Sequence, residues 1–248
     1  MSTPKVYFIS GANRPNGLGF NLAKKLSAQA DSLVFAAVRD PSTAKDLARL
    51  AEERKNLVVV KLDATSETDA KNAAELVAER PGKLDVLIPC AGICPMGSMR
   101  DQSLDDLRQA FEVNTVGPLI LYRAFQSLLA KSDAPVFMPI SSKAGCFAFV
   151  GMPMPTGYYG VSKCALNYLS AKLNAEDDKL CAFVCSPGIV MTDMTADGMR
   201  KAGMPPPPKE YTVELEDSVD GMVKVIGEAR RETHGGKFIE YNGEPVAW

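Results

Sequence analysis

Short apolar runs alternate with longer segments of helical periodicity along most of the chain. The first run, residues 6–10, has the β-branched and aromatic residues typical of a buried strand. After a glycine-rich turn, apolar residues recur at Leu18, Leu22, Ala23 and Leu26, which is the spacing of one helix face. Strands that alternate with helices of this kind predict βαβ units and a parallel sheet covered by helices on both faces.

The same pattern places the remaining elements. Strands are expected at 6–10, 33–38, 57–62, 85–88, 135–140, 181–185 and 237–241. Beyond the first helix, helical patterns end near 53, run from about 68 to 79 and from about 104 to 129, and begin again near 156. No repeat or linker divides the chain. We therefore expect one doubly wound, Rossmann-type α/β domain over residues 1–248, with a seven-stranded parallel sheet.

One stretch departs from the alternation. Residues 192–211 contain four consecutive prolines, 205–208, and the sequence predicts an irregular segment there. A loop of this length inside a compact domain is usually functional or mobile.

Composition narrows the partners. The 248 residues are 46% hydrophobic and carry a formal net charge of −2, which gives no electrostatic reason to expect nucleic acid or an anionic membrane. No apolar run approaches the roughly eighteen residues of a membrane span, and no apolar signal region follows Met1. We expect a soluble cytoplasmic protein that acts on a small molecule.

The six cysteines and the single histidine do not suggest a metal site. Two C-x3-C pairs occur, at 90–94 and 181–185, but all six thiols have apolar or small neighbours and His234 lies far away in sequence. Free cysteine behaves as a small hydrophobe, so buried free thiols are expected and no metal is assigned.

The turn after the first strand has the form of a phosphate cradle. Gly11, Gly17 and Gly19 stand between a strand and a helix, where backbone can approach a ligand and helix N–H groups can meet a pyrophosphate. An ordinary glycine-rich connection is the alternative, because the spacing departs from the usual dinucleotide fingerprint.

The end of the second strand bears on the choice of cofactor. Arg39 follows this strand directly, where NAD-binding chains are expected to carry a carboxylate. Together with Arg14, it can hold a 2′-phosphate, which indicates NADP(H). The alternative is that both arginines are only solvated.

A tyrosine and a lysine stand four residues apart at the head of the helix that begins near 156. This spacing puts Tyr159 and Lys163 on one helix face, and a neighbouring ammonium lowers the pKa of a phenol. Tyr159 can then exchange a proton in the working pH range. By itself the pair also occurs by chance on many helices.

Taken together, these motifs resemble the short-chain dehydrogenase/reductase family over the whole length of the chain. The matching segments, in order, are Ser10-Gly11, Gly17-Leu18-Gly19, Asp63, Ala91-Gly92, Asn114, Ile140-Ser-Ser142, Tyr159-x-x-x-Lys163 and Ser186-Pro-Gly-Ile-Val190. Arg39 and the ending 236–248 are most similar to the NADPH-dependent carbonyl reductase and fungal ketoreductase branch.

The resemblance implies a catalytic set. Tyr159 would protonate the carbonyl oxygen, Ser142 would hydrogen-bond the same oxygen, and Lys163 would lower the pKa of Tyr159 and hold the nicotinamide ribose. Asn114 would lie at a break in its helix and hold a water that links Lys163 to solvent.

It also implies a cofactor set and a lid. Residues 192–211 would close over the substrate. The implied cofactor residues are Gly11, Asn13, Arg14, Asn16, Gly17, Leu18, Arg39, Asp63, Ala64, Ala91, Gly92, Tyr159, Lys163, Pro187, Gly188, Val190 and Thr192.

Three features depart from the family pattern. Gly11 and Gly17 enclose five residues instead of three, and we interpret this as an insertion that places Pro15 and Asn16 in a bulge. Cys90 replaces the asparagine usual before Ala-Gly, so support for the sheet must come from elsewhere. The segment 145–155 is long and apolar, and it suits either a bulky hydrophobic carbonyl compound or a partner subunit.

We therefore expect an NADPH-dependent carbonyl reductase that assembles as a homodimer or homotetramer. Alcohol oxidation with NADP uses the same residues. An enoyl reductase and a non-catalytic NADP(H)-sensing protein are the remaining alternatives.

Overall fold

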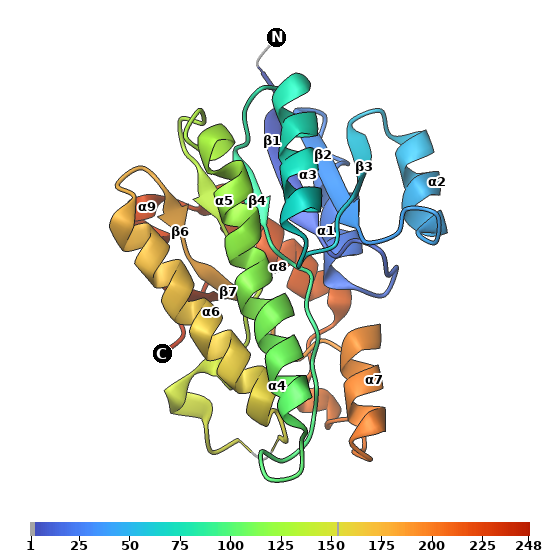
Figure 1. The fold of residues 1–248 in the computed structure, drawn as a ribbon, viewed down its shortest axis with the longest axis vertical. Helices are drawn as coiled ribbons and strands as arrows, with labels where there is room; N and C mark the ends of the chain where they lie inside the picture. Colours follow the sequence, from blue (N-terminus) through green and yellow to red (C-terminus); the bar gives the residue numbers. More distant parts are fainter. Residues whose placement is uncertain (1–2, 153) are drawn as a thin grey trace.

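The fold is organised around a parallel β-sheet (Figure 1), and the computed structural model describes residues 3–152 and 154–248. Six strands form the main sheet in the order β3-β2-β1-β4-β5-β6, and β7 pairs with β8 in parallel. The strands are β1 (Lys5–Ser10), β2 (Ser32–Val38), β3 (Leu57–Lys61), β4 (Val86–Ile88), β5 (Val136–Phe137), β6 (Cys181–Ala182), β7 (Val184–Ser186) and β8 (Phe238–Glu240).

The seventh expected strand is present, but it pairs outside the six-stranded sheet. β6 and β7 are the two ends of one extended segment, 181–186. Its odd-numbered amides donate toward β5, as Phe183 N does to Phe137 O at 3.1 Å, and Val184 N donates to Lys237 O at 3.1 Å on the other edge. Alternate amides of one extended chain therefore connect β5 to β8, and the parallel doubly wound architecture is confirmed.

Helices cover both faces of the sheet. α1, α2 and α8 pack on one face, and α3 and α5 pack on the other with α6 beside them. The helices are α1 (Leu18–Leu26), α2 (Lys45–Glu53), α3 (Glu67–Glu79), α4 (Leu104–Phe111), α5 (Gly117–Leu129), α6 (Gly157–Glu176), α7 (Asp193–Lys201), α8 (Leu215–Glu228) and α9 (Arg231–His234).

The central strand shows why both faces need cover. Along β1, Tyr7 and Ile9 contact the α1 and α8 side, whereas Val6 and Phe8 contact the α3 and α5 side. Successive side chains of a strand point to opposite faces, so a strand that is apolar at every position must be buried on both.

The helical stretch 104–129 is interrupted where the resemblance implied. α4 ends at Phe111, a single π-type turn occupies 112–116, and α5 continues from Gly117. The extra residue of such a turn changes the direction of the side chains around it, and Asn114 lies within it.

The expectation that 192–211 is irregular is wrong for its first half. α7 occupies Asp193–Lys201, and the Thr192 hydroxyl accepts a hydrogen bond from Thr195 N at 3.3 Å. Asp193 in the first turn and Arg200 with Lys201 in the last turn complement the helix dipole. These short-range signals outweigh the proline run, which begins only after the helix.

Two further expectations concern local segments. The long apolar segment 145–155 contains a 3₁₀ turn at Phe147–Phe149, and Pro153 within it lies outside the described residues. The cysteines are free, but only Cys146, Cys181 and Cys185 are buried, and the other three are half-buried.

In the described ranges no helix is long and apolar enough to cross a membrane, and no three His, Cys, Asp or Glu side chains form a metal-binding group.

Candidate active site

The residues that the sequence singles out meet at one edge of the sheet. Most of them follow the carboxyl ends of parallel strands, so they share the edge at which ligands of open α/β sheets bind. The residues are Gly11 after β1, Arg39 after β2, Asp63 after β3, Ala91 and Gly92 after β4, Ser142 after β5, and Pro187 and Gly188 after β7.

The glycine-rich turn packs closely against neighbouring backbone, so a side chain at Gly11 or Gly19 would collide with it. Gly11 has a φ of +74°, and a Cβ there would come within 2.7 Å of Ala91 Cα. A Cβ on Gly19 would lie 2.5 Å from Gly11 O. Gly17 precedes the first turn of α1, whose N–H groups have no intrahelical partner. Bare backbone at a helix N-terminus fits the pyrophosphate of a dinucleotide.

Pro15 and Asn16, the residues interpreted as an insertion, lie exposed in this turn, and Asn16 contacts the start of α7. Asn16 Nδ2 donates to Asp193 Oδ1 at 3.1 Å and to Met191 O at 3.3 Å, and Asn21 Nδ2 holds the turn from inside by donating to Pro15 O at 2.7 Å. Asn13 is exposed beside them. The side chain of Asn16 therefore connects the glycine-rich turn to α7.

The two arginines assigned to a 2′-phosphate are in different surroundings. Arg14 Nη1 lies 3.7 Å from Asp197 Oδ2 on α7. Arg39 is exposed at the end of β2. The pKa of Asp63 is lowered mainly by the hydrogen bonds from Thr65, and the charge of Arg39 lowers it further. Asp40 next to it accepts from Ser42 N and Oγ, so its carboxylate is engaged within its own turn.

The support that Cys90 cannot give comes from the first strand. Ser10 is buried, and its Oγ accepts from Cys90 N and Ala91 N, both at 3.1 Å. This hydroxyl joins the ends of β1 and β4 directly below the glycine-rich turn. The sequence reasoning assigned no role to it.

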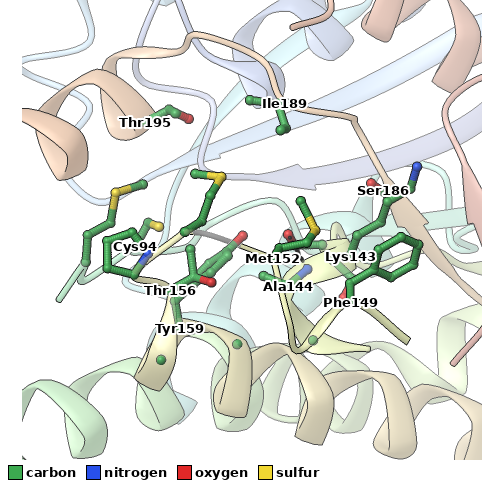
Figure 2. A pocket seen from close by; sticks show the side chains of 18 of the residues that line it. Cys94, Lys143, Ala144, Phe149, Met152, Thr156, Tyr159, Ser186, Ile189 and Thr195 are labelled. Atoms are coloured by element: carbon green, nitrogen blue, oxygen red, sulfur yellow. Dashed lines mark hydrogen bonds between the residues drawn. The ribbon is translucent and has the colours of Figure 1, made fainter. Parts of the chain in front are cut away.

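A large apolar cavity opens beside this edge (Figure 2), with a volume of about 1680 Å³. Ser142 and Tyr159 line it together with Leu18, Pro187, Gly188, Val190 and Thr192. Seven methionines also line it, from three separate segments: Met96, Met99, Met152, Met154, Met194, Met199 and Met204. The sequence-predicted catalytic pair and the residues after β7 therefore share one cavity.

The pKa of Tyr159 differs from the sequence-based prediction. Burial raises the pKa of this phenol strongly, the nearby Cys94 adds to the rise, and Ser142 lowers it by less. Lys163 Nζ lies 5.7 Å from the centre of the Tyr159 ring, and it is not among the causes of the shift. Burial therefore acts on this phenol in the direction opposite to the predicted effect of Lys163, and the lowering of the Tyr159 pKa by Lys163 stays a prediction.

Lys163 is buried, and a backbone carbonyl of the segment after β5 holds its ammonium. Its Nζ donates to Ile140 O at 2.7 Å, and burial lowers its pKa to about 8. The spacing of four residues on α6 places it on the same helix face as Tyr159.

Asn114 is fully buried and ties α4, β4 and α6 together. Its Nδ2 donates to Ile93 O at 2.9 Å and to Ser162 Oγ at 3.0 Å, and its Oδ1 accepts from Ile93 N at 2.9 Å. A Cβ on Gly92 would lie 3.1 Å from Asn114 Oδ1 and 3.9 Å from Lys163 Nζ. The Asn114 amide therefore holds the backbone of Ile93, which follows Gly92 near Lys163.

One further polar residue, Asn167, was missed in the sequence and orients Ser141, which precedes Ser142. Asn167 is buried on α6, accepts from Ser141 Oγ at 2.5 Å and donates to Gly145 O at 3.2 Å. Its position four residues after Lys163 is a signal that could have been used, because i and i+4 side chains share a helix face.

Comparison with known sequences identifies relatives over nearly the whole chain. The family model described as short chain dehydrogenase matches residues 5–202. An uncharacterized oxidoreductase of Schizosaccharomyces pombe is 34% identical over 98% of this chain and 97% of its own length. The norsolorinic acid ketoreductase of Dothistroma septosporum is also 34% identical, over 98% of this chain and 92% of its own length.

Solved structures agree with the fold. The NADPH-bound carbonyl reductase from chicken fatty liver superposes with a TM-score of 0.87 and 30% identity, and all of both chains is covered. The carbonyl reductase Sniffer of Drosophila melanogaster superposes with a TM-score of 0.85 over all of both chains, at 24% identity.

Proposed function

We propose that this chain, which belongs to the short chain dehydrogenase family, reduces ketones or aldehydes to alcohols with NADPH. The family membership makes it an oxidoreductase. The observation that carries the proposal is the shared cavity: the Ser142 hydroxyl and the Tyr159 phenol open to the same apolar space, and the buried Lys163 ammonium lies behind them. Two hydroxyl donors in one cavity suit an oxygen that gains charge.

The proposed mechanism gives each side chain one task. NADPH, when bound, supplies a hydride to the carbonyl carbon. Tyr159 donates its proton to the carbonyl oxygen, and its raised pKa keeps the phenol protonated at neutral pH. Ser142 donates a hydrogen bond to the same oxygen. Lys163 places a positive charge near the phenolate that forms, and Asn114 fixes the backbone around that charge.

Several features support NADPH as the cofactor. Gly11 and Gly19 let the glycine-rich turn pack closely against Ala91 and the start of α1, which keeps the N–H groups of the first turn of α1 available to a pyrophosphate. Arg39 lies at the end of β2 with its guanidinium exposed, and Asp40 is held by Ser42. The exposed guanidinium of Arg39 can therefore bind the 2′-phosphate on the adenosine ribose, which a carboxylate at this position would repel. Relatives named as ketoreductases and an NADPH-bound carbonyl reductase agree with this assignment.

Two parts of the proposal concern the surroundings of the site. Residues 192–211, with α7 at their start, would close over a bound substrate and exclude water. The homodimer or homotetramer and the cytoplasmic location stay predictions.

The experiment that tests the function follows NADPH oxidation by absorbance with aryl ketones, diketones, quinones and aldehydes, with NADH in parallel. NADPH-dependent turnover of at least one carbonyl class is the expected result. Turnover of alcohols with NADP alone, or of enones at the carbon–carbon bond, would assign the chain to the alternative chemistry of the same fold. Cofactor binding without any turnover would favour a sensing protein.

A further inference from the structure

The wall of the large cavity contains one ion pair in otherwise uncharged surroundings. Among the described residues that line it, only Lys143 and Glu240 carry charge. Lys143 Nζ lies 2.6 Å from Glu240 Oε1, which joins the residue after Ser142 to strand β8. The two side chains are 32% and 16% exposed, so the pair is largely withdrawn from bulk solvent.

The ammonium has a second neighbour. Lys143 Nζ lies 5.6 Å from the centre of the Phe149 ring, over its face. Figure 2 shows Lys143 beside Phe149 and Ser186, with Tyr159 farther along the cavity. The carboxylate and the ring thus hold the cation in the wall, and the charge of Glu240 compensates the charge of Lys143.

This arrangement has a consequence for the substrate. A carboxylate or phosphate that packs against the apolar part of the wall gives up hydration there and meets methionines, phenylalanines and prolines, where an unpaired charge is costly. The one cation that could pair with it, among the described lining residues, is already engaged by Glu240. A neutral ketone has no such cost, and flexible thioethers adapt well to aromatic rings.

We infer that the Lys143–Glu240 pair is a specificity-determining element that restricts the cavity to neutral, bulky aromatic ketones and excludes anionic ones of the same shape. The inference rests on the proposed carbonyl reductase function. It assigns Glu240 the part of keeping Lys143 from acting as an anion receptor.

The test compares two ketones that share one aromatic ketone and differ in charge and by one methyl group, 6-acetyl-2-naphthoate and its methyl ester. Wild-type protein should show a higher kcat/KM for the ester. Glu240→Gln keeps the shape of the side chain but releases the ammonium, and it should shift the acid-to-ester ratio toward the acid by about tenfold to a hundredfold, the effect of one charge-assisted hydrogen bond. An unchanged ratio in Glu240→Gln would overturn the inference and leave the pair a structural tie.

Two further variants separate specificity from folding and from net charge. Lys143→Glu combined with Glu240→Lys exchanges the partners and should return the ratio toward the wild-type value. Glu176→Gln makes the same change in net charge at an exposed pair on α6, where Lys172 Nζ lies 3.1 Å from Glu176 Oε1, and should leave the ratio unchanged. A shift of the ratio in Glu176→Gln equal to that in Glu240→Gln would mean that net charge alone is responsible, which contradicts the inference.

Binding keeps this test distinct from that of the proposed function. The affinities of both ketones are measured by calorimetry in the same variants. If neither ketone is reduced but the affinity ratio shifts in Glu240→Gln, the carbonyl reductase function fails and the cavity specificity stands. If both ketones are reduced with NADPH and neither ratio shifts, the function stands and the inference fails.

Discussion

Asn16 Nδ2 lies 3.1 Å from Asp193 Oδ1, so one hydrogen bond joins the glycine-rich turn to the first turn of α7. Asp193 N also donates to Asn16 O at 3.3 Å, which makes the contact reciprocal. Asn16 is one of the two residues interpreted as an insertion in this turn. Its contacts connect the carboxyl edge of the sheet to the segment proposed as a lid.

Removing this contact should loosen α7. Asn16→Ala deletes an exposed side-chain hydrogen bond, and such bonds stabilise by about 0.5–1.5 kcal/mol, so amide exchange in α7 should become roughly two- to tenfold faster. Hydrogen exchange followed by mass spectrometry measures this effect. Asn242→Ala, which removes only a local bond from Glu244 N, is the matched control. Equal exchange in α7 of both variants would mean that Asn16 does not hold the helix.

Loss of the phenol should abolish most of the chemistry while sparing cofactor binding. Tyr159→Phe removes the proposed general acid, and groups in that role contribute about 10²- to 10⁴-fold to the rate. Stopped-flow or steady-state NADPH oxidation measures kcat, and titration of NADPH fluorescence measures binding.

The adjacent tyrosine provides the control for that variant. The hydroxyl of Tyr158 lies 3.3 Å from Met99 O and has no part in the proposed mechanism. Tyr158→Phe therefore removes the same hydroxyl oxygen from the residue before Tyr159. It should retain turnover within a few-fold of wild type. If Tyr159→Phe is no slower than Tyr158→Phe, the proton donor has been misassigned.

The reduction should weaken at alkaline pH because of Lys163. Burial lowers the pKa of this lysine to about 8, so the ammonium is lost as the pH rises through that value. The raised pKa of Tyr159 keeps the phenol from ionising in the same range. Turnover should therefore fall above about pH 8, and a profile from pH 6 to 10 checks it. Lys163→Arg, whose charge persists, should remove the fall if the side chain is accommodated.

The same shift has a thermodynamic counterpart. Between about pH 8 and the ordinary lysine value of 10.5, the unfolded chain binds more protons at this site than the folded chain. The cost of burying the charge is therefore fully present below pH 8 and disappears as the pH rises to 10.5. Unfolding by urea should show wild type gaining stability relative to Lys163→Met over that interval, and a constant difference would contradict the assigned pKa.

Arg39 should decide between the two nicotinamide cofactors. Arg39→Ala removes the exposed cation at the end of β2, and the loss of a charged contact to a 2′-phosphate should raise the KM for NADPH about tenfold to a hundredfold. The KM for NADH should stay the same. Arg49→Ala, at an exposed pair with Asp46 on α2, serves as the control. A parallel rise for both cofactors would indicate a general loss of affinity and not recognition of the phosphate.

Ser10→Ala should destabilise the protein even though it removes only one hydroxyl group. Cys90 N and Ala91 N would lose their acceptor in a buried position, which costs about 1–3 kcal/mol in the free energy of unfolding. Urea denaturation measures the change. Ser42→Ala, at an exposed turn, should cost about 0.5 kcal/mol or less. Similar losses in both variants would show that the hydroxyl is not what joins β1 to β4.

Much of the fold was predictable because its signals are local. Apolar strands with helical patterns between them fix the parallel sheet, and the spacing of Tyr159 and Lys163 places both on α6. The break at Asn114 followed from the family resemblance, and the π-type turn at 112–116 agrees with it. α7 was not predicted because the prolines at 205–208 indicated an irregular segment, although Thr192 and Asp193 are capping signals for a helix before them.

Other parts of the site depend on distances that the sequence does not contain. The methionines of the cavity come from three segments far apart in the chain, and their convergence is a property of the fold. The partnership of Lys143 with Glu240 has no spacing that predicts it. The pKa of Tyr159 depends on how much water is excluded around the phenol, and a sequence neighbour at i+4 says nothing about that.

The strand order also describes how the molecule can grow during synthesis. After β1, β2 and β3 have paired, the remaining strands β4, β5, the segment 181–186 and β8 each add to the same edge in the order in which the ribosome delivers them. Until β8 arrives, that segment exposes unpaired backbone, and an open edge of this kind invites pairing with another nascent chain. The strand that brings Glu240 to Lys143 is thus also the one that closes the edge.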